Sequence, residues 1–461
     1  MSHWLVTSTH CRHLISLLYC DSKIALPHLP HIAMRIFYTR VFHKIAAFLF
    51  CIGCLSCASY ETEQREKITI EFWTIALGDA FADYVNGMIQ TYEDEHPEVQ
   101  IKWVDVSGGE VSEKLLAALV GQTPPDVVNI YDLPRFLQFG VLADMDSLVS
   151  PEEQNKRFDN FWRGIGQYQG RNYVIPWYTG VSMLWYNKSL FERAGLDSDQ
   201  PPKTIDEMLA MGQQIYERTG KYGVSWRLHP SLGTPPWALL HVDGFWPLFN
   251  EERSKTLIND PAAAAILQKW ITAYQNGTIP PEALAASHRD DVNWFIEGRA
   301  AMFPFSGGWI TRYFDKSFEQ VAQPAAQPRG RLGSVPANSQ AIVVPRMSDH
   351  VEQAVDFALF VTNDTNQLEF CRQVAILPST KKAAADPYFQ REPVTLADHA
   401  NLFSYRDIDN SFVITPPDVT GWSRMEDVLY EEFAKAMAGK QNIEQALQRV
   451  ERKWNHLLDY Q

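Results

Sequence analysis

Aromatic side chains at predicted strand ends and in loops are the residues of this chain best suited to chemistry. The face of an indole or phenol ring packs against the axial C–H groups of a pyranose, whose hydroxyl groups need planar donors and acceptors from Asp, Asn or Arg. Six rings are candidate stacking platforms: Trp73, Tyr131, Trp177, Tyr178, Trp309 and Trp422. Packing in the core or over a helix is the alternative for any one ring, and we assign it to Trp103, Trp162, Trp270, Trp294 and Trp454.

Motifs that usually accompany catalysis are missing from the sequence. It contains no Gly-x-x-x-x-Gly-Lys-Ser/Thr loop, no His-Glu-x-x-His pair, no Gly-x-Ser-x-Gly elbow and no Cys or His cluster after residue 57. The carboxylate pairs Asp290-Asp291 and Asp144 with Asp146 could serve a glycosidase, but helix caps and solvated faces explain such pairs more often. We therefore expect a protein that is not an enzyme and uses no metal or cofactor. A secreted carbohydrate hydrolase is the alternative.

Length and charge narrow the possibilities further. The chain has 461 residues, 46% hydrophobic and 21% charged, which is a globular composition and favours two lobes over one core. Its formal net charge of −14 opposes binding to nucleic acid and to anionic substrates. The sequence thus favours a neutral or cationic ligand.

The N-terminal region has the pattern of an export signal. Arg35, Arg40 and Lys44 precede the apolar run from Ile45 to Leu55, which is too short to span a bilayer, and Met34 is a candidate for the true start. Residues 1–57 are therefore expected to be an N-terminal extension and signal peptide.

Cysteines follow that run and suggest attachment of lipid. Cys51, Cys54 and Cys57 have small neighbours, and the segment looks like a bacterial lipobox with Cys57 as the lipidated residue and Cys54 as the alternative. Cleavage for soluble secretion beside Ser56 is a further possibility. Only Cys371 remains beyond this segment, so we expect no internal disulfide.

Strands and helices are predicted to alternate along the next part of the chain. Strands at 68–73, 99–104 and 126–131 are separated by helical stripes at 81–92 and 115–120. This alternation requires crossover connections and predicts an α/β fold with mostly parallel sheets covered by helices, in which ligands bind beyond the carboxyl ends of strands. The Ala-, Gln- and Pro-rich stretch at 321–331 is predicted to be a surface loop.

The segment from Asn172 to Glu207 combines two strands and two capped helices. Strands at 173–175 and 181–186 precede Asn187, which can cap a helix ending at Gly195, and Thr204 with Glu207 forms a capping box for the next helix. This order resembles the interlobe crossover of bacterial extracellular solute-binding proteins of the sugar-binding family that includes maltose-binding protein. Further segments resemble the same family in order: 295–302 followed by Gly307-Gly308-Trp309, 339–345, 351–362 and 439–447.

The resemblance, which covers about residues 68 to 460, implies a two-lobed periplasmic-binding-protein fold of type II with the ligand cleft between the lobes. It assigns residues 58–178 and 340–375 to the N-terminal lobe, and 179–339 and 376–461 to the C-terminal lobe. Chain crossings near 176–180, Ser339 and Leu377 would form the hinge.

The resemblance also implies ligand contacts. The end of the first strand would supply Trp73 and Asp79. The loop after the third strand would supply Tyr131 and Asp132, with Arg135 as a further candidate. From the other lobe come Thr234 and Trp237, near Asp243-Gly244, where Phe245 replaces the second glycine that is common in the family. Gly308 and Trp309 are the last of the implied contacts, because two glycines let a ring approach a ligand closely. Whether Trp177 and Tyr178 face the ligand or pack the hinge is left open.

Together these observations predict the substrate-binding component of an ABC importer, which captures a neutral saccharide or sugar-derived osmolyte. Its partners would be permease subunits with a separate ATPase. We expect an exported monomer, periplasmic or at the cell surface, anchored to the membrane by lipid. The alternatives are a binder of a cationic or other small solute with the same fold, a partner of a membrane sensor, and the hydrolase named above.

Overall fold

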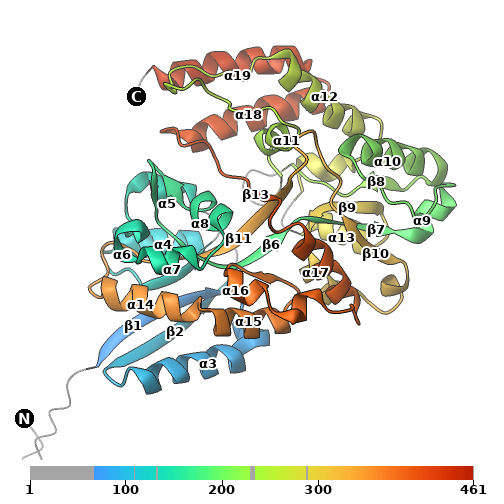
Figure 1. Cartoon of the computed structure of the whole chain (residues 1–461). Coiled ribbons are helices and arrows are strands. Elements are labelled where there is room, and N and C mark those ends of the chain that lie inside the picture. The colour runs from blue at the N-terminus through green and yellow to red at the C-terminus, as the bar shows by residue number, and fades with distance from the viewer. Residues whose placement is uncertain (1–66, 108–109, 131–132, 229–233, 287–288, 460–461) are drawn as a thin grey trace, which may run out of the picture. The chain divides into compact units, whose positions relative to one another are not determined.

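The structure is a computed structural model that describes residues 67–107, 110–130, 133–228, 234–286 and 289–459. Two β-sheets organise these residues, and helices cover both of them (Figure 1). Within the described ranges, no helix has the length and apolar character needed to cross a membrane. We call each sheet with its covering helices a lobe, numbered in chain order.

The sheet of the first lobe has the strand order β12-β6-β11-β3-β1-β2, and β13 pairs with β11. Its strands β1, β2 and β3 are parallel, as their alternation with helices predicts. By contrast β11 is antiparallel to β3 and β6, and β12 is antiparallel to β6, so this sheet is more mixed than predicted. The strands are β1 (Ile68–Ile75), β2 (Val99–Val106), β3 (Val127–Ile130), β6 (Ile175–Val181), β11 (Val335–Val343), β12 (Leu377–Pro378) and β13 (Ser411–Val413).

Apolar side chains project from both faces of this sheet into two separate cores. In β3 the neighbours Val127 and Val128 enter different cores, because successive side chains of a strand point to opposite faces. One core includes side chains of α3 (Gly78–Glu95) and α14 (Val351–Val361), and the other includes side chains of α4 (Val111–Val120) and α5 (Pro134–Phe139). Figure 1 shows these helices around β1 and β2.

The sheet of the second lobe has the order β10-β7-β9-β8. Only β8 and β9 are parallel in it, so the expectation of a mostly parallel sheet does not hold here. Its strands are β7 (Met183–Asn187), β8 (Tyr222–Val224), β9 (Ala300–Ser306) and β10 (Ala322–Ala326). A short hairpin, β4 (Gln167–Tyr168) with β5 (Arg171–Asn172), lies outside both sheets.

Strand β10 corrects the prediction of a surface loop at 321–331. It pairs with β7 along its whole length, and Ala322 and Ala325 are buried. The sequence misled because Pro324 suggests a loop, whereas β10 lies at the edge of the sheet, where a residue without an N–H group is tolerated.

Local helix signals agree with the prediction. The side chain of Asn187 accepts a hydrogen bond from the backbone N–H of Leu190 at the start of α9 (Lys188–Arg193), and Gly195 takes a left-handed φ of 75° just after that helix. Thr204 and Glu207 form the expected capping box of α10 (Ile205–Thr219). These features depend on a few neighbouring residues, which is why sequence alone identifies them.

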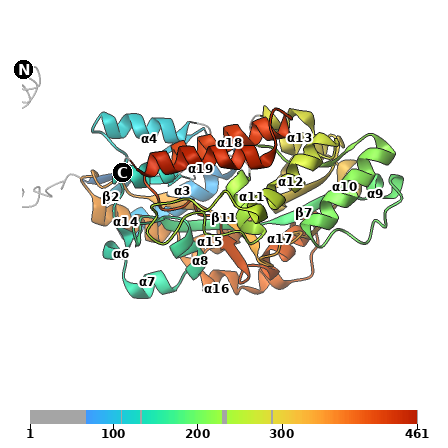
Figure 2. The same ribbon diagram turned by 90° about the horizontal axis from the view of Figure 1, so that it is seen from above.

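The helices α18 (Trp422–Met437) and α19 (Ile443–Leu458) lie side by side (Figure 2) and share the core of the second lobe with α11 (Pro236–Val242) and α12 (Pro261–Gln275). The remaining helices are α6 (Met145–Leu148), α7 (Pro151–Asn155), α8 (Asp159–Gly164), α13 (Asp290–Ile296), α15 (Asp364–Gln373), α16 (Lys381–Ala384) and α17 (Leu396–Arg406). Four short 3₁₀ helices complete the described elements: η1 (Pro281–Leu284), η2 (Gly308–Tyr313), η3 (Phe318–Gln320) and η4 (Pro387–Gln390).

Strand β6 connects the two sheets and differs from its predicted position. The strand predicted at 173–175 lies further along the chain: β6 begins at Ile175 and contains both Trp177 and Tyr178. Only Ser182 separates β6 from β7 of the second sheet. The aromatic pair therefore belongs to a paired strand at the point where the chain leaves the first sheet.

Candidate functional site

A cavity of about 830 Å³ lies beside Trp309, the residue most clearly predicted to contact a ligand. Its wall combines η2 and η3 of the second lobe with Phe81 of α3, the end of α15 and the start of α17. Two aromatic rings and several polar groups line it: Phe81, Trp309, Thr311, Arg312, Lys316, Glu319, Gln320, Gln373 and Thr395. This mixture of ring faces and hydrogen-bonding groups suits a polar ligand with an apolar face.

Two glycines allow Trp309 to reach this position. A Cβ atom on Gly308 would lie 2.8 Å from the Cβ atom of Ala375 and 3.3 Å from its carbonyl oxygen. Since Ala375 follows α15, η2 can press against the first lobe only with glycine at this place. The Thr311 hydroxyl donates to the carbonyl of Gly308 at 2.9 Å and closes the turn.

The Arg312 guanidinium extends the aromatic surface. Its central carbon lies 5.9 Å from the ring centroid of Trp309 and 4.9 Å from that of Tyr313, within the range of cation–π attraction. No ion pair within 4.0 Å engages Arg312, Lys316 or Glu319 in the described part of the chain. Their charges therefore remain available to a ligand.

Tyr178 of β6 is half-buried and close enough to Arg312 to be influenced by its charge. Burial raises the pKa of the Tyr178 hydroxyl and so does Cys371, whereas Arg312 lowers it. The phenol is therefore protonated at neutral pH and can donate a hydrogen bond. Its ring packs edge-on against Phe370 at 5.3 Å, and Phe370 also contacts Phe81 of the cavity.

Three of the aromatic rings predicted to contact the ligand are buried. The exposed fractions of Trp177, Trp237 and Trp422 are 0, 3 and 1%. Trp177 stacks on Phe370 at 5.6 Å, and Trp237 meets Trp422 edge to face at 5.7 Å. In this conformation the three rings pack against protein and present no face to solvent.

Two other predicted contacts, Trp73 and Asp79, lie in the first lobe, and the Trp73 indole already has a hydrogen-bond partner. The indole N–H of Trp73 donates to the Glu71 carboxylate at 2.7 Å. Asp79 is exposed in the first turn of α3, and it does not cap that helix, because the Asp105 carboxylate accepts from the backbone N–H groups of Leu77 and Gly78 instead. Thus the Asp79 side chain is accessible to a ligand.

Some of the remaining predicted contacts lie within the described residues, and others lie outside them. Thr234 is half-buried just before α11, and Arg135 forms an ion pair with Glu113 at 2.7 Å instead of pointing to a ligand unpaired. Tyr131 and Asp132 lie outside the described residues, as do the lipidation candidates Cys54 and Cys57.

Sequence reasoning missed two residues of the cavity wall, Phe81 and Lys316. Phe81 was included in an ordinary helical stripe, and nothing in the sequence separates it from its core neighbours. Lys316 joins Arg312 on the cavity wall because η2 and η3 follow one another closely, which sequence spacing does not disclose.

Two sheets linked directly from β6 to β7, with an aromatic cavity lined from both lobes, define a two-lobed solute-binding protein of the periplasmic-binding-protein fold. The chain belongs to the bacterial extracellular solute-binding protein family, whose sequence profile matches residues 78–368. The predicted family and fold are thereby confirmed, as is a binding protein rather than a hydrolase. Because the family is extracellular, the protein is an exported one.

Individual relatives agree with this assignment. A periplasmic-binding protein of Synechococcus sp. MITs9220, solved in complex with zinc, is 27% identical with a TM-score of 0.77 over 85% of this chain and 99% of that one. The cyclic alpha-maltosyl-1,6-maltose binding protein of Arthrobacter globiformis is 22% identical, with a TM-score of 0.69 over 86% of this chain and 100% of that one. Its similarity supports the fold. The arabinooligosaccharide-binding protein of Bacillus subtilis is 24% identical over 327 residues, which are 68% of this chain and 72% of the relative.

Proposed function

We propose that this protein is the substrate-binding component of an ABC importer and captures a neutral saccharide or sugar-derived osmolyte. The observation that carries the proposal is Trp309, held by two glycines on the wall of a cavity that also contains polar side chains. Relatives that bind maltose-type and arabinose oligosaccharides support the same ligand class. Permease subunits and a separate ATPase would complete the importer.

Capture would proceed by closure of the two lobes. Residues 58–178 with 340–375 would form most of one moving body, and 179–339 with 376–461 most of the other. Strands β12 and β13 would move with the first body, because they pair with β6 and β11 of its sheet. A ligand that contacts both bodies stabilises the closed arrangement by the difference in its affinity for the two states. The cavity supports this idea because Phe81 and Trp309 come from different lobes.

The ligand contacts follow from exposure and position. Trp309 would stack on the sugar ring, Tyr178 would donate a hydrogen bond, and Asp79 would accept one. We include Trp73, Thr234, Tyr131 and Asp132 as further contacts on the strength of the family resemblance. Trp177, Trp237 and Trp422 would support the site by packing beneath it, since their rings are covered.

Calorimetry with mono-, di- and trisaccharides and osmolytes tests the function directly. We expect binding of at least one compound, and Trp309→Ala should weaken it about tenfold, since aromatic contacts contribute about 1 kcal/mol beyond buried area. Phe139→Ala is the matched control, because Phe139 is an exposed ring that does not line this cavity. Failure of every compound to bind would contradict the saccharide assignment, and unchanged affinity of Trp309→Ala would remove that ring from the site.

An anionic sugar is the second candidate, and Arg312 with Lys316 favours it. Sequence reasoning disfavoured anions on the basis of overall charge, but these two cations line the cavity together against one carboxylate, Glu319. Competition between glucose and glucuronate separates the candidates. Preference for glucuronate that weakens with salt and is lost in Arg312→Gln would support the anionic ligand.

Attachment to the membrane forms the last part of the proposal. Cys57, or Cys54 as the alternative, would carry the lipid, and the protein would act as a monomer in the periplasm or at the cell surface. The basic residues and the apolar run before these cysteines support export by a signal peptide. Mass spectrometry of the mature N-terminal peptide tests this, and an unmodified peptide that begins elsewhere would contradict it.

A further inference from the structure

Arg289 of the second lobe places its side chain against an aromatic ring. It directly precedes α13, it is half-buried, and its φ of 75° lies in the left-handed region, where residues other than glycine are uncommon. Its guanidinium carbon lies 4.2 Å from the centroid of the Tyr313 ring at the end of η2. A backbone in this region persists where the surrounding contacts hold it, so the position of Arg289 calls for an explanation.

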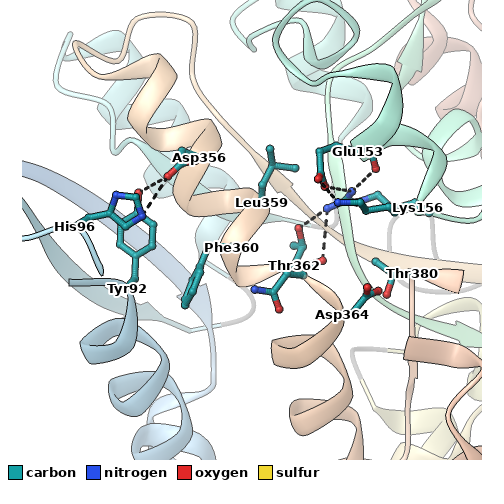
Figure 3. Close-up of a pocket in the computed structure, with 12 residues that line it drawn as sticks. Tyr92, His96, Glu153, Lys156, Asp356, Leu359, Phe360, Thr362, Asp364 and Thr380 are labelled. Atoms are coloured by element: carbon teal, nitrogen blue, oxygen red, sulfur yellow. Dashed lines mark hydrogen bonds and ion pairs between the residues drawn. The ribbon is translucent and has the colours of Figure 1, made fainter. Parts of the chain in front are cut away.

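Arg157 of the first lobe shows the more usual way to hold a guanidinium. It donates to the Glu153 carbonyl at 2.7 Å and to the Thr362 hydroxyl at 2.9 Å, and Figure 3 shows both of these partners beside a cavity of about 350 Å³. Arg289, by contrast, forms no side-chain hydrogen bond and no ion pair among the described residues. The Tyr313 ring is therefore the main described partner of its charged group, and cation–π attraction is strongest where water is partly excluded.

Tyr313 connects this guanidinium to Trp309. The two rings meet edge to face, with 6.3 Å between their centroids and an angle of 88° between their planes. The guanidinium carbon of Arg312 lies 4.9 Å from the Tyr313 centroid, so two cations share one phenol ring. Because both are attracted to the face of the ring, they restrict the orientation of Tyr313.

The backbone beside Trp309 leaves its ring room to move. Gly307 and Gly308 precede it, and a Cβ atom on Gly307 would lie 3.0 Å from Cδ1 of Trp309, so the indole lies over bare backbone on that side. A ring that changes rotamer would present its stacking face for only part of the time. The apparent affinity for a ligand falls by the same fraction, because the binding-competent state is only partly populated.

We propose that Arg289 is a positioning residue for Trp309. Its guanidinium holds the ring of Tyr313, and Tyr313 keeps the indole of Trp309 in the orientation that stacks on a sugar. Arg289 is not among the residues that line the cavity of about 830 Å³, so it acts through Tyr313 and not by touching the ligand. The stacking role of Trp309 rests on the proposed function, whereas the contacts among the three side chains do not.

Fluorine NMR of the whole mature protein labelled with 5-fluorotryptophan tests the orientation of the ring without a ligand. The Trp309 resonance is the one that disappears in Trp309→Phe. We expect this resonance to shift or broaden in Arg289→Met, which removes the charge but keeps the length, and to match the wild type in Arg289→Lys, which keeps a cation. Tyr313→Leu should reproduce the change seen in Arg289→Met, and the double variant should add nothing. Arg299→Met is the matched control, because Arg299 pairs with Glu282 at 2.7 Å.

Calorimetry with maltose measures the consequence for binding. Arg289→Met should raise the dissociation constant about two- to fivefold, which corresponds to the loss of one cation–π contact. Arg289→Lys should restore most of the affinity. In a Trp309→Ala background, Arg289→Met should have no further effect, because the ring that it positions is gone.

Two results would overturn the proposal. An unchanged Trp309 resonance in Arg289→Met, with or without a loss of thermal stability, would give Arg289 a purely structural role at the start of α13. Equal changes in Arg289→Lys and Arg289→Met would show that the cation plays no part. If maltose and the other saccharides fail to bind while the resonance responds as expected, the proposed function fails and the positioning of the ring by Arg289 stands.

Discussion

Trp309 and Trp422 occupy two regions of the second lobe with opposite surroundings. Trp309 follows two glycines and lines a cavity, whereas Trp422 begins a long helix and packs among Trp237, Phe249 and Trp454. Both rings are candidate stacking platforms by the sequence alone. The difference teaches that residue type alone does not decide the role of a tryptophan, because the backbone that carries it determines whether a face remains uncovered.

The largest expected effect concerns the buried ring. Trp422→Ala should lower the free energy of unfolding by about 3–5 kcal/mol, because it opens a cavity between α18 and α19. Denaturant unfolding followed by circular dichroism measures this. Trp422→Phe retains most of the packing and should lose clearly less. A loss below about 1 kcal/mol in the alanine variant would contradict the packing role.

The same helix contains a buried charge whose effect depends on pH. Burial alone would raise the pKa of Glu432, but hydrogen bonds from Lys453, Gln441 and Lys435 outweigh it and lower the value from 4.5 to about 2. Folding thus lowers the pKa, so the carboxylate contributes stability above pH 4.5 that disappears as pH falls towards about 2.

Glu432→Gln should therefore destabilise the protein by about 3 kcal/mol at pH 7. The difference from wild type should shrink as the pH falls from about 4.5 to about 2. Urea unfolding at a series of pH values checks this, with Glu431→Gln as the control because Glu431 is far more exposed on the same helix. A difference that stays constant with pH would show that the ion pairs do not act as described.

A smaller effect is expected at the glycine that supports Trp309. Gly308→Ala should cost about 1–3 kcal/mol, because the added methyl group would lie 2.8 Å from the Cβ atom of Ala375. Gly87→Ala is the control, since a Cβ atom there meets nothing within 4 Å inside α3 and should stabilise the helix slightly. Thermal unfolding of both variants compares them, and equal melting temperatures would contradict the close contact.

The smallest effect on stability should come from Trp309 itself. Trp309→Ala should change the free energy of unfolding by no more than about 1 kcal/mol, because its ring is partly exposed and lines an open cavity. The same variant should lose affinity for sugar. A destabilisation as large as that of Trp422→Ala would show that Trp309 is packed as a core residue, which would contradict the difference between the two regions.

The parts of the fold that sequence predicts well depend on short-range rules. The caps at Asn187 and Thr204 and the parallel strands β1 to β3 follow from neighbouring residues and from alternation. The strand β10 was missed because the role of Pro324 depends on its position at a sheet edge, which is a tertiary property. Burial of Trp177 likewise depends on its contact with Phe370, which comes almost two hundred residues later in the chain.

The same limit applies to the candidate site. Trp309 could be identified from its two preceding glycines, but Phe81 and Lys316 reach the cavity only through packing of separate elements.

The position of β11 has a consequence for the synthesis of the chain. This strand lies between β3 and β6 in the first sheet, yet every strand of the second sheet precedes it in the sequence. A ribosome therefore releases β3 and β6 long before the strand that joins them, and their inner edges have no partner during that interval. The first lobe, although it begins the described chain, can complete its sheet only after the sheet of the second lobe has been synthesised.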